Sequence, residues 1–402
     1  MKISTFQIIV LALFIGLIML GVGLFASRNN GGGGAGVGKV VIWGAVEPAA
    51  MQTALDDLRQ NNKALSNVTY VYKNPTTYSS ELVDAMAAGR GPDLFFVTPE
   101  TATQFFDKIQ VIPYSAVSQQ AFMAAYVDEG SLLLTSGGPL ALPVLIDPLV
   151  LYWNRDSLAG ASIAEPPSNW DTLLSMAPQL TVVDESAMVQ KSAAALGSWG
   201  NITNAKELFL ALAMQAGDPI VARDASGTAE LRFGDVPQGA SQSPAAEALR
   251  FYTEFSNPTK TSYSWNRSLP EAADAFVAGR LALYIGFASE YPTLLLRNPN
   301  LRVGVAPLPQ LKDAGQRLTY GRLNALAIAR TASNPAGALA VAEVLAGQAG
   351  VTALATAAKL PPVRRDVTFD TSSNAVMSVF VRSAVMSRAW LDPNPTKTND
   401  IF

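Results

Sequence analysis

The chain has 402 residues, 49% of them hydrophobic and 15% charged, with a formal net charge of −3 at pH 7. This length and composition predict about two folded domains and exclude a disordered chain, while the scattered basic residues disfavour a nucleic-acid partner. Histidine and cysteine are absent, which excludes thiolate chemistry, disulfides and His or Cys metal ligands, so we expect no metal and no cofactor.

The first predicted element is residues 8–26, nineteen residues without a charge. A helix of this length spans about 28 Å, close to the roughly 30 Å hydrocarbon core of a bilayer. We predict a single transmembrane anchor, with residues 1–7 in the cytoplasm, and a cleaved signal sequence is the alternative. Residues 27–38 form a glycine-rich linker, a composition typical of flexible tethers. The protein is therefore expected at the cell membrane, with its folded part on the extracytoplasmic face.

From Lys39 onward, short apolar runs alternate with amphipathic segments, which predicts an α/β fold with a largely parallel sheet. Residues 40–44 and 94–97 are typical of buried strands. The helices are expected to begin at polar residues that cap the first turn, namely Ser79, either Asn169 or Ser168, Asn204 (with Glu207 as a capping box) and Asn334. Two further residues are expected to be structural: Asp93 in a Gly-Pro-Asp turn, and Trp265 in the core.

Several stretches, taken in order, resemble the extracellular solute-binding protein family 1, the maltose-binding-like group. They are VIWG (41–44), AAGRGPDLFFV (87–97), ALPVLIDPLVLYWNRD (141–156), PPSNWDTLL (166–174), AFVAGRLALYIG (275–286) and VGVAPLPQ (303–310). Each match is short, but together they extend over most of the chain that follows the linker.

This resemblance implies a two-lobed clamp of the periplasmic-binding-protein-like type II fold. Residues 39–145 and 311–348 would form the first lobe. Residues 146–310 and 349–402 would form the second lobe. The chain would cross between the lobes near Asp147 and near Pro307, and these crossings would act as hinges.

In such clamps the ligand lies between the lobes, at the carboxyl ends of strands. The resemblance places acids and rings there, and the sequence adds Trp43, which could stack on a flat ligand, and Trp199, which lies in a glycine-bracketed loop. The expected ligand-binding residues are Trp43, Glu47, Glu100, Asp147, Trp199, Phe287 and Tyr320. Structural roles stay open for each of them, for example a core position for Trp43 and hinge pairing for Asp147.

The function implied by the resemblance is that of an extracytoplasmic substrate-binding component of an ABC importer, without enzymatic activity. Its partners would be a small polar solute, with carbohydrate favoured, and the transmembrane subunits of the ABC permease. A membrane-anchored sensor or scaffold is one alternative. A glycosidase that uses Asp147 and Glu100 is the other, because paired carboxylates can cleave glycosidic bonds.

Overall fold

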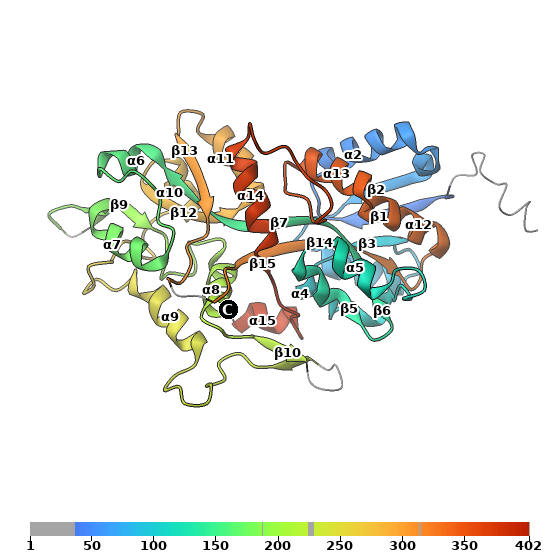
Figure 1. The fold of residues 1–402 in the computed structure, drawn as a ribbon, viewed down its shortest axis with the longest axis horizontal. Coiled ribbons are helices and arrows are strands. Elements are labelled where there is room, and N and C mark those ends of the chain that lie inside the picture. The colour runs from blue at the N-terminus through green and yellow to red at the C-terminus, as the bar shows by residue number, and fades with distance from the viewer. Residues whose placement is uncertain (1–36, 187, 224–228, 313–314, 402) are drawn as a thin grey trace, which may run out of the picture.

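The computed structural model describes residues 37–186, 188–223, 229–312 and 315–401. The predicted membrane anchor, residues 1–7 and most of the predicted linker lie outside these ranges. The described chain forms two lobes side by side, joined by strands that run through the middle of the molecule (Figure 1). Within these ranges no single helix is long and apolar enough to cross a membrane, and only α12 (Pro335–Ala346) and α13 (Gln348–Ala358), bent by 65°, reach that length together.

The first lobe is built on a sheet whose strands alternate with helices. In spatial order the strands are β2 (Val68–Tyr72), β1 (Val40–Gly44), β3 (Leu94–Val97), β14 (Thr319–Ala329) and β7 (Ala141–Asn154). Strand β1 is parallel to β2 and β3, and β14 is antiparallel to both β3 and β7. Strand β7 leaves this lobe for the second one, so the carboxyl ends of the strands parallel to it also point toward the second lobe.

The remaining elements of this lobe cover or flank that sheet. They are α2 (Pro48–Asn61), η1 (Lys63–Asn67), α3 (Tyr78–Ala87), α4 (Pro99–Ala102), η2 (Phe106–Lys108), β4 (Ile109–Gln110), α5 (Gln119–Ala125), η3 (Asp128–Leu133), β5 (Leu134–Thr135) and β6 (Gly138–Pro139). All four residues of β3 are buried, as expected for a strand with both faces covered.

The second lobe continues the sheet along the second half of β7. Its strands are β12 (Leu281–Phe287) and β13 (Val303–Pro307), both antiparallel to β7, then β9 (Val189–Ala194) and β8 (Val182–Val183). Its other elements are α6 (Arg155–Gly160), α7 (Trp170–Leu180), α8 (Ala205–Gln215), β10 (Val221–Arg223), β11 (Ala229–Leu231), α9 (Pro244–Glu254), α10 (Ala272–Val277), η4 (Ala288–Glu290), α11 (Tyr291–Arg297) and α14 (Ala375–Val385).

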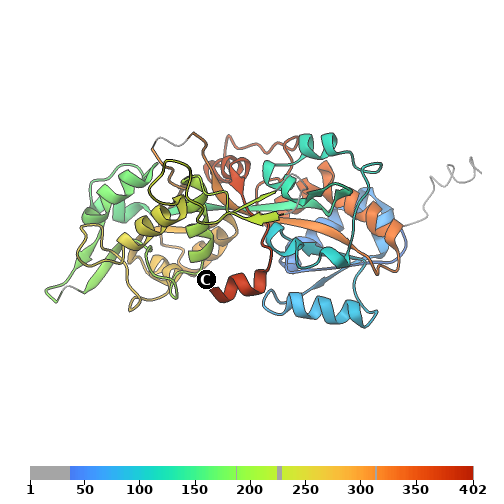
Figure 2. The same cartoon turned by 90° about the horizontal axis from the view of Figure 1, so that it is seen from below.

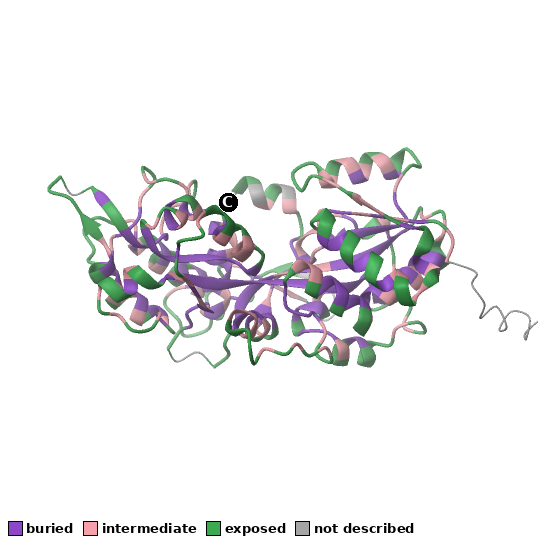
Figure 3. Cartoon of the chain, turned by 90° about the horizontal axis from the view of Figure 1, so that it is seen from above, coloured by how far each residue is buried: buried purple, intermediate pink, exposed green. Residues whose placement is uncertain are grey.

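Strand β7 is the main connection between the lobes. Residues 141–148 pair with β14, and residues 149–154 pair with β12 and β13. Thirteen of its 14 residues are buried, and Figure 3 shows this buried strand running from one lobe into the other. The first predicted crossing, at Asp147, therefore lies where β7 changes partners.

The C-terminal segment also passes between the lobes. Strand β15 (Ser387–Arg388) pairs with the start of β14, and α15 (Pro395–Ile401) lies between the two lobes (Figure 2). Asp392 contacts both sides, because its carbonyl accepts a hydrogen bond from Thr103 and its carboxylate lies 4.0 Å from the ammonium of Lys206 on α8.

Helix α13 packs along α2 of the first lobe, whereas the sequence-based boundary at residues 348–349 assigns it to the second. We therefore propose that the chain returns to the second lobe after α13. The second expected crossing, near Pro307, corresponds to the end of β13, and the chain re-enters the first sheet through β14.

Two of the predicted helix caps are confirmed and two are not. Asn169 and Asn334 each accept a hydrogen bond from a backbone N–H in the first turn of α7 and α12. Ser79 is wrong as a cap, because α3 begins one residue earlier, at Tyr78. Asn204 precedes α8 but its side chain makes no capping bond, because its amide donates instead to the carboxylate of Glu290.

The two residues expected to be structural are confirmed in that role. The carboxylate of Asp93 accepts hydrogen bonds from the backbone N–H groups of Val41 and Asn334, which ties β1 to the start of α12. Trp265 is fully buried, and its indole N–H donates to Asn201.

Candidate ligand-binding site

The candidate site is centred on β14, where that strand lies beside the crossing of β7. Arg322 of β14 stands opposite Asp147 of β7 in the strand register. Side chains alternate along a strand, so Tyr320 and Arg322 project from the same face of β14. Elements of both lobes supply the groups that meet these two side chains.

Asp147 is 6% exposed, and its Oδ1 accepts a hydrogen bond of 3.0 Å from the backbone N–H of Ser289, in the turn after β12. Burial raises the pKa of Asp147 to about 6, although the bond from Ser289 and the charge of Arg322 act in the opposite direction. The carboxyl group thus joins the crossing strand to the carboxyl end of a second-lobe strand.

Arg322 reaches from β14 toward two elements of the second lobe. Its Nη2 donates a 2.8 Å hydrogen bond to Oε1 of Glu207 on α8, and its guanidinium carbon lies 3.6 Å from the centroid of the Phe287 ring. Phe287 is fully buried, whereas 42% of the Arg322 side chain is exposed. The ring therefore supports a charged group that remains accessible.

Glu100 and Tyr320 form a hydrogen-bonded pair on the first-lobe side. Glu100 lies in the first turn of α4, directly after β3, and its Oε1 accepts the hydroxyl hydrogen of the buried Tyr320. Burial raises the pKa of Glu100, because few water molecules can stabilise its charged form. The carboxyl end of a first-lobe strand thus meets β14 here.

Glu129 is a further acid beside this strand, and no motif or spacing in the sequence points to it. It is 1% exposed, its Oε1 accepts a 3.1 Å bond from the N–H of Leu323, and its Oε2 has no hydrogen-bond partner among the described residues. Burial raises the pKa of Glu129 well above its ordinary value, and the nearby charge of Glu100 adds to this effect.

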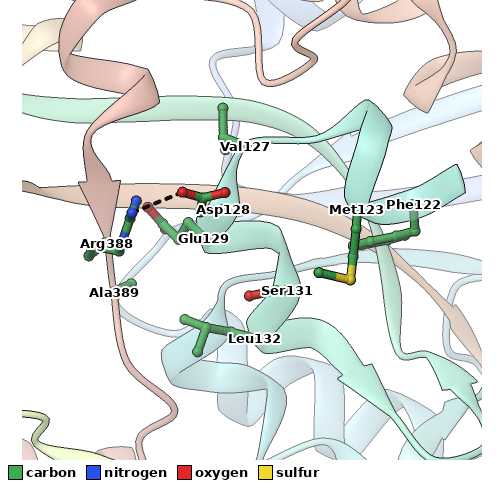
Figure 4. A pocket seen from close by; sticks show the side chains of 9 residues that line it. All are labelled: Phe122, Met123, Val127, Asp128, Glu129, Ser131, Leu132, Arg388 and Ala389. Atoms are coloured by element: carbon green, nitrogen blue, oxygen red, sulfur yellow. Dashed lines mark hydrogen bonds and ion pairs between the residues drawn. The ribbon is translucent and has the colours of Figure 1, made fainter. Parts of the chain in front are cut away.

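A cavity of about 270 Å³ lies beside Glu129 (Figure 4). On its rim Arg388 pairs with Asp128 at 2.9 Å. Its lining residues are Phe122, Met123, Val127, Asp128, Glu129, Ser131, Leu132, Arg388 and Ala389. The cavity belongs to the first lobe and to the C-terminal segment that passes it.

Glu290 fixes the loop after β12. Its carboxylate accepts bonds of 2.7 Å from the backbone N–H of Phe287 and 2.8 Å from the amide of Asn204, and it also accepts the hydroxyl hydrogen of Tyr284. These bonds hold the backbone of Phe287 in place, and the ring of Phe287 in turn packs against the guanidinium of Arg322.

The structure therefore gathers four of the seven expected residues, Glu100, Asp147, Phe287 and Tyr320, around β14. The described contacts of the other three lie elsewhere. Trp43 is partly buried, and the ammonium of Lys73 lies 3.8 Å from its ring centroid. Glu47 is exposed, and its carboxylate caps α2 by accepting a hydrogen bond from the backbone N–H of Ala50. Trp199 is 37% exposed, and its ring centroid lies 6.5 Å from that of Tyr252.

The chemistry of this arrangement is hydrogen bonding by paired donors and acceptors. The described residues contain no group of three or more carboxylates placed to hold a metal ion. Carboxylate oxygens, a tyrosine hydroxyl and guanidinium N–H groups lie beside a buried ring, which suits a polar ligand with both donors and acceptors.

Comparison with solved structures confirms the two-lobed clamp fold. A cyclo/maltodextrin-binding protein complexed with maltotetraose has a TM-score of 0.70 at 16% identity, over 91% of this chain and 89% of that one. A cyclic α-maltosyl-1,6-maltose binding protein from Arthrobacter globiformis has a TM-score of 0.71 at 16% identity, over 89% and 90% of the two chains. A solute-binding protein of an ABC transporter from Thermotoga lettingae, bound with α-D-tagatose, has a TM-score of 0.65 at 18% identity, over 90% and 91%.

The sequence comparisons agree with this fold. Binding proteins of Brucella abortus and Brucella suis are 22% identical over 271 residues, which is 66% of this chain. The match spans 61% of the length of these relatives. The family model described as bacterial extracellular solute-binding protein matches residues 45–352. The chain belongs to the bacterial extracellular solute-binding protein family.

Proposed function

We propose that this protein is the substrate-binding component of an ABC importer, which captures a small carbohydrate between its lobes and delivers it to the permease transmembrane subunits. The observation that supports this most directly is the hydrogen-bonding cluster around Arg322, to which both lobes contribute. A ligand held by such a cluster favours the closed form, because it gains contacts with the second lobe only when the lobes approach.

The ligand class rests on the cluster and on the similar structures. Sugar hydroxyls donate and accept hydrogen bonds at once, and the cluster offers acceptors on Asp147 and Glu100 next to donors on Arg322. Maltotetraose and tagatose are bound in two of the structures that this chain resembles. Carbohydrate is therefore the first class to test.

The protein is proposed to act outside the cell and to bind its ligand without cleaving it. The family is one of extracellular proteins, and we propose that residues 8–26 anchor this member to the membrane with its lobes outside. Each carboxylate of the cluster accepts a hydrogen bond from another group of the protein, and a carboxylate can accept such a bond from a sugar hydroxyl without a covalent step. We therefore propose binding rather than glycoside hydrolysis.

A binding screen tests the proposal. The folded part is heated in the presence of maltotetraose, mannotriose, tagatose, polyamines and short peptides. A ligand at 100 times its dissociation constant stabilises the folded state by about 2.7 kcal/mol, which raises the melting temperature measurably. Stabilisation by a carbohydrate and not by the amines or peptides is expected, and the reverse pattern would contradict the sugar assignment.

Two further measurements separate the alternatives. Release of reducing ends from a bound oligosaccharide, lost in Asp147→Asn, would establish a glycosidase. Uptake of the bound sugar by cells should disappear when the gene is deleted, and unchanged uptake would favour the sensor or scaffold.

A further inference from the structure

We propose that residues 387–401, which we call the strap, tie the second lobe to the first and limit how far the two lobes open before a ligand arrives. The strap consists of β15, the stretch 389–394 and α15. The restraint acts on the ligand-free protein, so it is separate from the proposed function and can be tested without a ligand.

The middle of the strap is buried although it lies outside any helix or strand. Trp390, Leu391 and Asp392 are all buried, whereas chain segments without regular structure normally lie on the surface. Trp390 and Leu391 line a cavity of about 350 Å³ together with Leu132 of η3 and Met214 of α8. The buried stretch therefore borders a space to which both lobes contribute.

Several contacts hold the strap to the first lobe. Strand β15 pairs in parallel with the start of β14. Arg388 forms an ion pair of 2.9 Å with Asp128 of η3 (Figure 4). The backbone carbonyl of Asp392 accepts the hydroxyl hydrogen of Thr103, the residue directly after α4. The first lobe thus holds the strap both at its beginning and at its buried middle.

The contact with the second lobe is made by the carboxylate of Asp392. Its Oδ1 accepts bonds of 2.9 Å from the N–H of Asn394 and 2.8 Å from the hydroxyl of Thr398, which fixes its orientation at the start of α15. Its Oδ2 accepts no hydrogen bond within the part of the chain that the structure describes, and lies 4.0 Å from the ammonium of Lys206 on α8. A fully buried carboxylate is costly without a nearby cation, so this arrangement favours keeping α8 close to the strap.

The two ends of this bridge adjoin the candidate site. Thr103 follows Glu100 by three positions, and Lys206 directly precedes Glu207. Figures 1 and 2 show α15 between the two lobes. Because Asp392 contacts both lobes, they can separate here only if it leaves one of them. A contact made only while the lobes are near each other shifts the population toward that arrangement.

Pulsed electron paramagnetic resonance on the ligand-free protein tests the restraint. The chain has no cysteine, so nitroxide labels attach only where cysteines are introduced. Gln120→Cys on α5 and Leu249→Cys on α9 place one label on each lobe at an exposed position. Lys206→Met removes the charge that faces Asp392 and keeps most of the length of the side chain. The mean distance between the labels should increase by more than about 2 Å, the scale of a hinge rearrangement.

Two control variants isolate the charge of Lys206. Lys206→Arg keeps a cation within reach of Asp392 and should keep the wild-type distance. Lys108→Met removes the same charge from an ion pair within the first lobe, where the ammonium lies 2.9 Å from Asp107, and should also leave the distance unchanged.

A double variant separates a bridge from two local effects. Thr103→Val removes the hydroxyl that donates to the carbonyl of Asp392. Combined with Lys206→Met, it should open the lobes no further than Lys206→Met alone, because a strap already free of the second lobe no longer restrains it. Fully additive lengthening would show two independent contacts and would contradict the bridge.

The remaining outcomes decide the inference separately from the proposed function. An unchanged distance in Lys206→Met would overturn the restraint, and so would equal lengthening in Lys108→Met. Removal of residues 389–402 should lengthen the distance as Lys206→Met does, and a truncated protein with the wild-type distance would contradict the role of the strap. If the truncated chain does not fold, the Lys206 variants decide alone. Binding of a sugar by the wild type supports the proposed function whatever these distances are.

Discussion

Burial raises the pKa of Asp147 to about 6 from its ordinary value of 3.8, so the folded chain holds this proton more tightly than the unfolded chain does. Below about pH 4 the group is protonated in both states and costs no stability. As the pH rises through about 4 to 6, the unfolded chain loses the proton first, so the free energy of unfolding falls. The full cost, about 3 kcal/mol for a shift of about two pKa units, is present above that range.

Asp147→Asn should remove this dependence, because the amide oxygen still accepts the bond from Ser289 and carries no charge. Urea unfolding at several pH values gives the free energy of unfolding of both proteins. The wild type should lose stability relative to the variant between about pH 4 and pH 7. The control is Asp107→Asn, at an exposed acid whose pKa the bond from Lys108 lowers. A wild-type curve parallel to that of Asp147→Asn would contradict the assignment.

At the scale of one element, β14 depends on Gly321. A methyl group at this position would lie 2.4 Å from Oε2 of Glu129 and 2.6 Å from Cβ of Ser387, both closer than real contacts allow. Gly321→Ala should therefore destabilise the protein by about 1–3 kcal/mol, the usual cost of overpacking. Thermal unfolding measures the change.

The matched control for Gly321→Ala is Gly160→Ala, at the end of α6, where an added methyl group meets no atom within 4 Å. This variant should be neutral or slightly stabilised, since alanine favours the helix and restricts the unfolded chain. Equal effects of the two substitutions would mean that the close approach of β14, Glu129 and β15 does not constrain the fold.

Buried strands were predictable from local sequence, because each shows as an apolar run. The caps of α7 and α12 were predictable too, because a short polar residue directly precedes the first turn of each helix. The family motifs predicted the two-lobed fold, and the acids and rings at the strand ends included four residues that the fold brings together around β14. Asp93 was also predictable in its structural role, since a Gly-Pro-Asp turn leaves backbone N–H groups for its carboxylate to bind.

Contacts between distant segments were not predictable. Glu129 meets Leu323 across 194 positions, and Glu207 meets Arg322 across 115. Asn204 and Glu207 match the local capping-box pattern, but tertiary partners take both side chains and no capping bond forms. A single sequence shows residue types and spacing, and neither reveals which distant strand lies beside a given acid.

At the scale of the whole molecule, the lobes can move relative to each other only as far as their connections bend. Strand β7 changes partners at Pro148, which stands opposite Gly321. Proline has no N–H to donate to the sheet and a fixed φ, so this position is both weakly paired and stiff. The hinge should therefore bend around Pro148 through a narrow range, which keeps the ligand-free lobes near the binding arrangement.

Pro148→Gly should widen that range, because glycine samples more backbone conformations than proline, a difference of up to about 0.4–1 kcal/mol where the chain is free to sample them. The ligand-free protein then has more conformations to lose on closing, so its affinity for a neutral sugar should fall by about twofold to fivefold. Small-angle scattering should show a larger ligand-free radius of gyration for the variant and the same compact value as wild type once sugar is bound. Pro143→Gly, in the same strand but paired within the first lobe to Ala325, should lower stability and leave both the affinity and the scattering change as in the wild type. If the two variants behave alike, closure does not depend on the point where β7 passes from one lobe to the other.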